Sequence, residues 1–309
     1  MGLIQTSGLK QVNASTTSPD NFTMPGNFTA GHSAVVSLSY FQSSSIVISA
    51  ISLGGSAATL ESRTTDGAGA YVEIWRVQNL AGGSNSISVT STTTSHFLNL
   101  SVEERDDMQA VAADIVATPG SGTSTAPSAT YGTLAQADEI VYIAYVDVGG
   151  TNEASSTPPT SYTQAWVELN GSANLGGSGA YRVVSSTAGA SPAFTLATST
   201  GWRAVLVTFK LNPAGPTIDT QPQNATVYQG QTANFTVSAT TSGGALSYQW
   251  KDDGVNVGTN SSSYTTAATV LGDNGAQITC AVTDSNGTTT TAAATLTVIP
   301  TGISAWIRA

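Results

Sequence analysis

Cysteine is almost absent from this sequence of 309 residues, since Cys280 is the only one. A disulfide within the chain is therefore impossible. A thiol enzyme would need a base or cation that lowers the thiol pKa of Cys280, and the surrounding "GDNGAQITCAVTD" supplies none. We therefore expect Cys280 to be a buried, unreactive thiol that packs as a small hydrophobic side chain.

Charged residues are scarce as well, at 9% of the chain, where about a quarter is usual. The 9 Lys+Arg against 19 Asp+Glu give a net charge of −10. No cluster of Lys and Arg is present to neutralise phosphates, which argues against nucleic acid as a partner. Ser, Thr, Gly, Ala and Asn fill the difference and predict a surface rich in hydroxyl and amide groups.

Long apolar runs are missing too: no stretch approaches the roughly 18 consecutive apolar residues of a membrane helix. The start "MGLIQTSGLKQVNAST" has no basic segment, apolar run or cleavage site of a secretory signal. A hydroxyl-rich β-protein without an export signal favours a virion protein that is made in the host cytoplasm and released by lysis. A fragment of a larger secreted protein, or a non-classical export route, would give the same pattern.

Catalytic and metal-binding patterns are equally sparse. The only histidines, His32 and His96, have no Cys or His at ligand spacing. The sequence has no Gly-x-Ser-x-Gly elbow, and its Gly-rich stretches lack the Lys of a phosphate-binding loop. We therefore expect a non-enzymatic protein with no cofactor and no metal.

Glu73 and Glu168, each beside a Trp in a strand-like run, are the best remaining enzymatic candidates. Glycoside cleavage needs two carboxylates about 5 to 10 Å apart, but the favoured interpretation is that both glutamates face outward while the tryptophans face inward. The cluster from Glu103 to Asp107 contains oxygen ligands suited to calcium. A solvated, charged turn is the favoured interpretation of that cluster.

Strand periodicity dominates the chain and predicts an all-β fold, because only "SVEERDDMQA" has the polarity of a helical turn. Three prolines in "LNPAGPTIDTQPQ" mark a domain boundary. The expected organisation is an N-terminal β-sandwich over residues 1–212, a Pro-rich linker at 213–220, a C-terminal domain over 216–300 and a tail at 301–309.

Residues 1–212 contain a weak internal sequence repeat, in which similar segments are separated by 106 residues. "AVVSLSYF" resembles "IVYIAYVD", and two later pairs of segments match at the same offset. The halves, roughly residues 9–105 and 111–211, would form either two separate sandwiches or one jelly roll whose strands pair across the halves. The jelly roll is favoured, because "TPGSGTSTAPS" is suited to a long connection across a sandwich. This region also resembles the β-sandwich domains of phage structural proteins.

The C-terminal segment alternates in "GQTANFTVSAT", has Trp250 in "LSYQWKDDG" and ends the pattern with "DNGAQITC". In order and spacing it resembles an immunoglobulin-like domain from Pro216 to Pro300. The resemblance implies that Val237, Trp250 and Cys280 form the core pin of that fold, here apolar rather than covalent. Ile278 stands where the family's corner tyrosine would be.

Aromatic residues offer a further possibility, a platform on which a sugar ring stacks. Trp75, Trp166 and Trp202 lie in strongly alternating runs, so core packing is predicted for them. Tyr162, in the Pro-rich "STPPTSYTQ", is the most plausible exposed aromatic residue and the candidate for ligand contact.

The predicted function is that of a structural protein on the exterior of a bacteriophage particle, in a head decoration or head fibre. Its expected partners are other virion proteins and further copies of itself, and the resemblance implies weak attachment to host-surface glycans. A tail or baseplate protein is the alternative within the same class. A bacterial extracellular carbohydrate-binding or adhesin protein is the rival from another class, and a glycosidase comes third.

Overall fold

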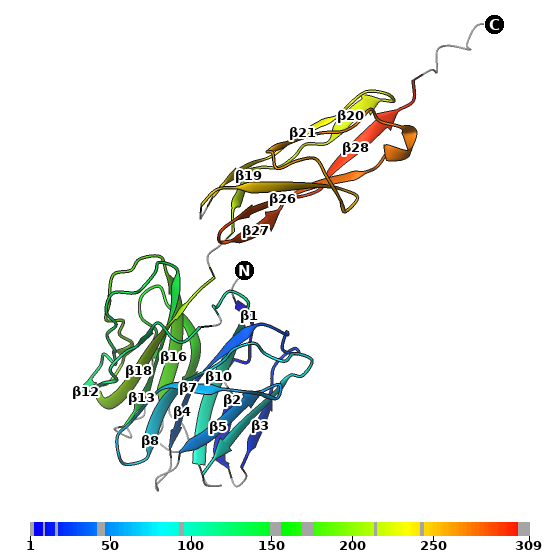
Figure 1. Ribbon diagram of the computed structural model, residues 1–309. Coiled ribbons are helices and arrows are strands. Elements are labelled where there is room, and N and C mark those ends of the chain that lie inside the picture. Colours follow the sequence, from blue (N-terminus) through cyan, green and yellow to red (C-terminus); the bar gives the residue numbers. More distant parts are fainter. Residues whose placement is uncertain are drawn as a thin grey trace, which may run out of the picture. The chain divides into compact units, whose positions relative to one another are not determined.

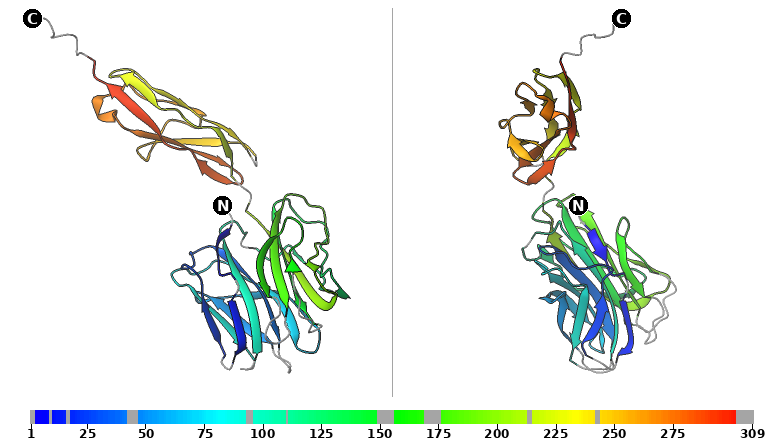
Figure 2. Two further views of the ribbon diagram at one scale, coloured as in Figure 1. Left: turned by 180° about the vertical axis from the view of Figure 1, so that it is seen from behind. Right: turned by 90° about the vertical axis from the view of Figure 1, so that its right-hand side faces the viewer.

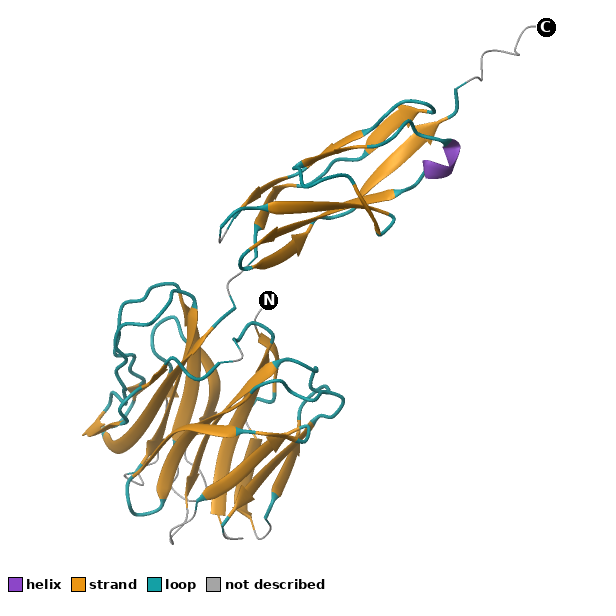
Figure 3. Cartoon of the chain, viewed as in Figure 1, coloured by secondary structure: helices purple, strands orange, loops and turns teal. Residues whose placement is uncertain are grey.

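The computed structural model divides the chain into two compact units, Met1–Leu211 and Asn212–Ala309 (Figure 1). The described residues are 3–8, 10–15, 18–41, 47–92, 96–109, 111–148, 156–168, 176–212, 215–241 and 244–301. Among them the regular elements are strands, apart from one short 3-10 turn at Leu271–Asp273 (Figure 3). The predicted all-β class is therefore confirmed. No helix in these ranges has the length and apolarity to cross a membrane.

The first half of the N-terminal unit consists of two sheets. The larger has the order β1-β10-β4-β8-β7, with β2 also paired to β10, and the smaller has the order β3-β9-β5-β6. The bounds are β1 Leu3–Thr6, β2 Lys10–Ser15, β3 Asp20–Thr23, β4 Ser33–Phe41, β5 Ile48–Leu53, β6 Ser56–Ala57, β7 Thr59–Thr65, β8 Ala70–Val77, β9 Ser86–Ser91 and β10 His96–Arg105. Alternate residues such as Leu38 in β4, Leu100 in β10 and Val89 in β9 form the core of this half.

The second half repeats the larger sheet. Its order is β11-β18-β13-β16-β15, with β12 also paired to β18, and β14 and β17 form a separate pair. The bounds are β11 Ile115–Val116, β12 Gly120–Ser124, β13 Glu139–Asp147, β14 Ser156–Thr157, β15 Thr163–Glu168, β16 Gly177–Val184, β17 Thr195–Leu196 and β18 Thr200–Lys210. The strand order matches that of the first half, and β13 begins 106 residues after β4, so the two halves are related as predicted.

The favoured jelly-roll arrangement is not what the sheets show. Every pairing between the described strands of this unit joins members of the same half. The physical reason is that β4 and β13 are buried on both faces: every residue of β13 is buried, and in β4 only Phe41 is partly exposed. Each large sheet therefore packs one face inside its own half and turns the other face to the sheet of the other half.

A separate core lies between the two large sheets. Val35 and Ile74 of the first half pack there with Tyr142, Val207 and their neighbours of the second half. Figure 2 shows the two halves, blue to cyan and green, as adjoining layers. The halves thus keep their own sheets but share a core, which makes Met1–Leu211 one compact unit.

The C-terminal unit is an Ig-like β-sandwich. One sheet has the order β20-β28-β26-β23-β24, with β27 paired to β26, and the strands β19-β22 and β21-β25 form two further pairs. The bounds are β19 Thr217–Thr220, β20 Ala225–Tyr228, β21 Asn234–Thr236, β22 Ser238–Thr240, β23 Ser247–Asp252, β24 Val255–Val257, β25 Ser263–Thr265, β26 Gln277–Asp284, β27 Gly287–Thr290 and β28 Ala294–Ile299.

Val237, Trp250 and Cys280 lie together in the core of this unit. Trp250 and Cys280 are directly paired residues of β23 and β26, and both are fully buried. Ile278, at the position of the missing corner tyrosine, is also fully buried and contributes to the same core. Residues 213–214 of the linker and residues 302–309 of the tail are outside the described ranges.

Candidate binding site

The second half of the N-terminal unit contains a pocket of about 300 Å³. Its walls include two tyrosines, an arginine, two prolines and a serine: Tyr131, Tyr162, Arg182, Pro159, Pro192 and Ser191. We call this site the tyrosine pocket. The volume is at the lower end of the range for small-molecule sites in proteins, so it suits one small ring or side chain.

Tyr131 is held in place by its backbone. Its N–H donates to the carbonyl of Ala190 at 3.0 Å, and the N–H of Ala190 donates back to the carbonyl of Tyr131 at 3.1 Å. A Cβ atom on the neighbouring Gly189 would lie 2.6 Å from the Tyr131 carbonyl oxygen, so glycine is required for this close approach. Tyr131 is almost fully buried, with 4% exposure.

Tyr162 reaches the pocket from a tight turn between β14 and β15. Its N–H donates to the carbonyl of Pro159 at 2.9 Å, and Ser161 adopts the left-handed conformation with φ 67. The sequence predicted Tyr162 to be exposed, whereas its side chain is half-buried in the pocket wall. The structure thus places the one predicted ligand-contact residue beside two residues that the sequence did not single out, Tyr131 and Arg182.

The electrostatics of the pocket favour neutral phenols beside a cation. Burial, followed by the neighbouring Tyr131, raises the pKa of Tyr162. Burial also raises the pKa of Tyr131, although the charge of Arg182 and a hydrogen bond with Tyr162 oppose the rise. Both tyrosines therefore stay protonated at neutral pH, and each keeps a hydroxyl able to donate or accept a hydrogen bond.

The three tryptophans considered for a sugar platform pack in the cores, as predicted. Trp75, Trp166 and Trp202 have exposures of only 5%, 2% and 6%. Their indole nitrogens donate to groups of the protein itself, Trp75 to Glu73 and Trp202 to Ser124. No exposed stacking face is left on these side chains.

The favoured outward orientation of Glu73 is wrong. Residues two apart on a strand share a face, so Glu73 lies on the same face of β8 as Trp75, and it is fully buried. Its carboxylate accepts hydrogen bonds from Tyr40 at 2.6 Å, from Arg63 and from Trp75. Burial raises the pKa of Glu73. These occupied oxygens serve the packing of the first half, and the side chain of Glu168 is outside the described residues.

The interpretation of residues 103 to 107 as a solvated turn is also wrong for most of the cluster. Glu103, Glu104 and Arg105 are the last residues of β10 and are buried. Glu104 accepts the backbone N–H of Thr29 at 2.8 Å, and its Oε1 lies 2.9 Å from Nδ1 of His32. Burial raises the pKa of Glu103 to about 7. Among the described residues, no group of His, Cys, Asp and Glu is arranged to hold a metal ion.

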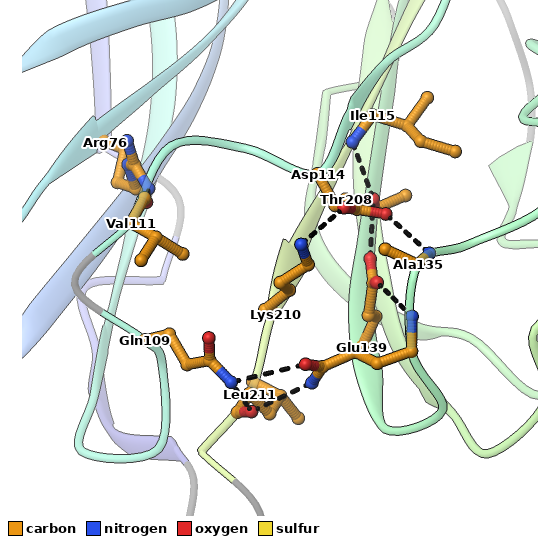
Figure 4. A network of polar contacts seen from close by, with 11 residues as sticks. Arg76, Gln109, Val111, Asp114, Ile115, Ala135, Glu139, Thr208, Lys210 and Leu211 are labelled. Carbon is orange, nitrogen blue, oxygen red and sulfur yellow. Dashed lines mark hydrogen bonds and ion pairs between the residues drawn. The ribbon is translucent and has the colours of Figure 1, made fainter.

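A second polar cluster lies where β18 ends (Figure 4). The ammonium of Lys210 lies 2.9 Å from Asp114 Oδ1, and the N–H of Ala135 donates to Asp114 Oδ2 at 2.9 Å. Thr208 donates to Glu139 Oε2, also at 2.9 Å. No sequence pattern singled out this network, because its members come from segments that are far apart along the chain.

The two carboxyl groups of this network, Asp114 and Glu139, influence each other's pKa, and the two values shift in opposite directions. Burial and the charge of Asp114 raise the pKa of Glu139 despite the hydrogen bond from Thr208. For Asp114 burial acts in the same direction, but the hydrogen bonds from Lys210 and Ala135 outweigh it and lower the pKa. The partners occupy these oxygens, so the network anchors the end of β18 rather than presenting a reactive group.

No family model matches the sequence, and no curated protein matches it. Among solved structures, Duf (Kirre) D1 is similar at 18% identity, covering 28% of this chain and 100% of that chain with a TM-score of 0.25. The Ig1-2 module of the Drosophila receptor protein tyrosine phosphatase DLAR is similar at 15% identity, covering 56% and 99% with a TM-score of 0.26. The fibronectin(III)-like modules of Clostridium thermocellum CbhA are similar at 11% identity, covering 62% and 100% with a TM-score of 0.25. The Ig-like assignment of the C-terminal unit rests on its own strand order and core.

Proposed function

We propose that this protein is a non-enzymatic structural and binding protein on the exterior of a bacteriophage particle, in a head decoration or head fibre. The observation that carries the proposal is the division of the chain into one large unit of two fused β-sandwich halves and one smaller Ig-like unit. Such a division suits a protein that attaches with one part and displays another. A place in the tail or baseplate is the alternative within this proposal.

The N-terminal unit is the part suited to attachment. A lasting interface buries at least about 1,000 Å², and the larger unit has more surface to supply it. The shared core between its two halves keeps that surface rigid, so little conformational entropy is lost on docking. Neighbouring virion proteins and further copies of the chain are the proposed partners.

The Ig-like unit is the part suited to display. The hairpin of β23 and β24 and the turn that follows it, "KDDGVNVGTNSSS", are polar and acidic, and Val255 in β24 is 67% exposed. A surface of this kind fits weak contacts with host-surface glycans, repeated over many copies, so that avidity replaces affinity. The scarcity of Lys and Arg argues against a nucleic-acid partner.

A bacterial extracellular carbohydrate-binding or adhesin protein is the second candidate function. The tyrosine pocket favours this candidate, because a concave site with two tyrosines and an arginine is suited to binding a small ligand. Such binding is useful on a cell surface as well as on a phage particle. Genes for portal, capsid or tail proteins beside the gene of this protein would support the phage proposal. Genes for secretion or cell-wall proteins beside it would support the bacterial one.

Counting copies on purified particles tests the phage proposal. The full-length protein is expected on the particle surface, and a variant that lacks residues 216–309 is expected at the same copy number with weaker adsorption to the host. Circular dichroism of the purified variant checks that its sandwich is folded. Particles that lack a folded truncated variant would show that the C-terminal unit is the anchor, and particles that lack the full-length protein would refute the proposal.

A further inference from the structure

The tyrosine pocket has the chemistry of a site for an acidic sugar. We infer that it binds a saccharide unit that carries a carboxylate, with Arg182 facing the carboxylate and Tyr131 and Tyr162 facing the ring. This inference rests on the proposed surface-binding function and names a ligand class for it. It also locates ligand binding in the N-terminal unit, whereas the sequence resemblance implied glycan contact by the Ig-like unit.

Arg182 is the first reason. The arginines Arg63, Arg76 and Arg105 each form an ion pair with a carboxylate of the protein, and Arg203 donates to two backbone carbonyls. Among the described residues, Arg182 has no such ion pair or hydrogen bond, although it lines the pocket. In a protein of net charge −10, an uncompensated guanidinium beside a pocket is well placed to receive an anionic ligand group.

A single guanidinium favours a carboxylate over a more highly charged group. Arginine and a carboxylate match in charge and in geometry, since two parallel N–H groups donate to the two oxygens. A phosphate carries more negative charge and more acceptor oxygens, and proteins commonly hold it with several cations or with backbone N–H groups. The tyrosine pocket contains one cation among its lining residues.

The two phenols supply the hydroxyl chemistry. Tyr131 and Tyr162 both line the pocket. Each phenol hydroxyl can donate one hydrogen bond and accept others from a ligand. Thr160 and Ser191 add aliphatic hydroxyls on the pocket wall. The wall therefore offers hydrogen-bond donors and acceptors on several sides, which suits a sugar ring with hydroxyl groups around its edge.

The apolar part of the pocket matches the faces of such a ring. Pro159 and Pro192 lie in the wall with the tyrosines, and sugar rings present C–H groups above and below the ring. Aromatic side chains pair an apolar face with a polar tip and are suited to such amphipathic ligands. The volume of about 300 Å³ accommodates one ring, so we expect recognition of a single unit within a longer glycan.

Binding of methyl glucuronide to the full-length protein tests the inference, with methyl glucoside as the neutral control. The dissociation constant for the glucuronide, measured by calorimetry or ligand-observed NMR, is expected to be about millimolar. The glucoside is expected to bind at least about tenfold more weakly, because it lacks the charge-assisted hydrogen bonds to Arg182. Glucuronide affinity is also expected to fall as salt is added.

Two pocket variants and one matched control locate the site. Arg182→Gln removes the charge while keeping a hydrogen-bonding group of similar length, and it is expected to weaken glucuronide binding about tenfold or more. Tyr162→Phe removes one hydroxyl and is expected to weaken both sugars. Lys251→Gln makes the same charge change in the C-terminal unit and is expected to leave both affinities unchanged. Thermal unfolding of each variant checks that the fold is intact.

Three results would overturn the inference: equal affinity for glucuronide and glucoside, unchanged glucuronide binding in a folded Arg182→Gln variant, or acetate and a short peptide carboxylate binding as tightly as the glucuronide. The last result would identify a general carboxylate site. Failure here is separable from failure of the proposed function, because the copy number of Arg182→Gln on particles is measured independently. A variant that is present on particles but does not bind the sugar leaves the virion proposal standing.

Discussion

The indole Nε1 of Trp166 in β15 donates a hydrogen bond of 2.9 Å to Oγ of Ser37 in β4. Trp166 belongs to the second half of the N-terminal unit and Ser37 to the first, so this bond joins the two halves through their shared core. A Cβ atom on Gly179 would lie 2.2 Å from the same nitrogen. Glycine at that position therefore lets the indole lie against β16 and reach across to the other half.

Ser37→Ala should destabilise the N-terminal unit, because it leaves the buried indole N–H of Trp166 without an acceptor. An unsatisfied buried donor costs about 1–3 kcal/mol, and the free energy of unfolding measured in urea should fall by that amount. The matched control is Ser39→Ala on the same strand. Ser39 is fully buried, but its hydroxyl has no hydrogen-bond partner within the described part of the chain, so its removal should be neutral or slightly stabilising. Equal losses in both variants would contradict this account.

Cys280 should be slow to react with thiol reagents in the native protein. Its side chain is fully buried, and burial raises the pKa of the thiol to about 11, so little thiolate exists at neutral pH. Labelling should reach the rate of an ordinary cysteine only in denaturant. Cys280→Ala should lower the unfolding free energy of the C-terminal unit by about 1 to 2 kcal/mol through lost packing. Fast labelling of the folded protein would rule out this assignment.

Glu103 should make the N-terminal unit less stable as pH rises. Its pKa is raised from 4.5 to about 7 by burial, so between those values the native state binds more protons than the unfolded state. The contribution of Glu103 to stability is therefore greatest below pH 4.5 and is lost as pH rises to about 7. Glu103→Gln should flatten this decline and should stabilise the protein at pH 8, by a few kcal/mol at most.

The neighbouring Glu104 is the control for that pH profile, because its shift has the opposite sign. Burial would raise the pKa of Glu104, but hydrogen bonds from Gln5, Thr29 and His32 outweigh burial and lower it. Its contribution to stability is present above the unfolded pKa and is lost as pH falls. Glu104→Gln should therefore cost stability at neutral pH. The same pH profile for both variants would show that the two carboxyl groups are misassigned.

Limited proteolysis should cut the chain first in the proline-rich segment after Leu211. The boundary between the two compact units falls there along the chain, and linkers between domains are the preferred sites of proteolytic nicking. Two stable fragments, near residues 1–211 and 216–301, are the expected products in mass spectrometry. Cleavage between residues 105 and 111 should be slower, since the shared core holds the two halves together. Degradation of the whole chain without surviving fragments would contradict independent folding of the two units.

Local sequence patterns were sufficient to predict the strands, the two related halves and the Ig-like core. They were not sufficient to predict how the two halves pack together. Because β4 and β13 are buried on both faces, the alternation of apolar and polar residues does not tell which face of each strand packs against which sheet. The orientation of Glu73 was readable, since a spacing of two from the buried Trp75 requires a shared face. The charges of Glu103 to Arg105 suggested a solvated turn, yet pairing in β10 buries them. Glu104 contacts Thr29 and His32 of the first half, and Arg105 lies over the ring of Tyr181 in the second half.

The tyrosine pocket was predictable only through Tyr162, whose Pro-rich surroundings marked a loop. The local sequence gives no sign that Tyr131 and Arg182 belong to a site. Tyr131 lies between β12 and β13 and Arg182 lies in β16, so only the tertiary fold brings them together. The Asp114 and Glu139 pair was missed for the same reason. Ion pairs and pockets of this kind depend on contacts between distant segments, which the periodicity of a single strand does not encode.

The parallel pairing of β20 with β28 determines how the Ig-like unit would respond to mechanical load. The registered pairs are Ala225 with Leu296, Thr226 with Thr297, Val227 with Val298 and Tyr228 with Ile299. One strand lies near the start of this unit and the other at its end, so tension between its two ends pulls the parallel strands in opposite directions along their length. Such shear loads all the pairs at once, whereas peeling would break them one by one. The unit is therefore built to resist unfolding when its two ends are pulled apart.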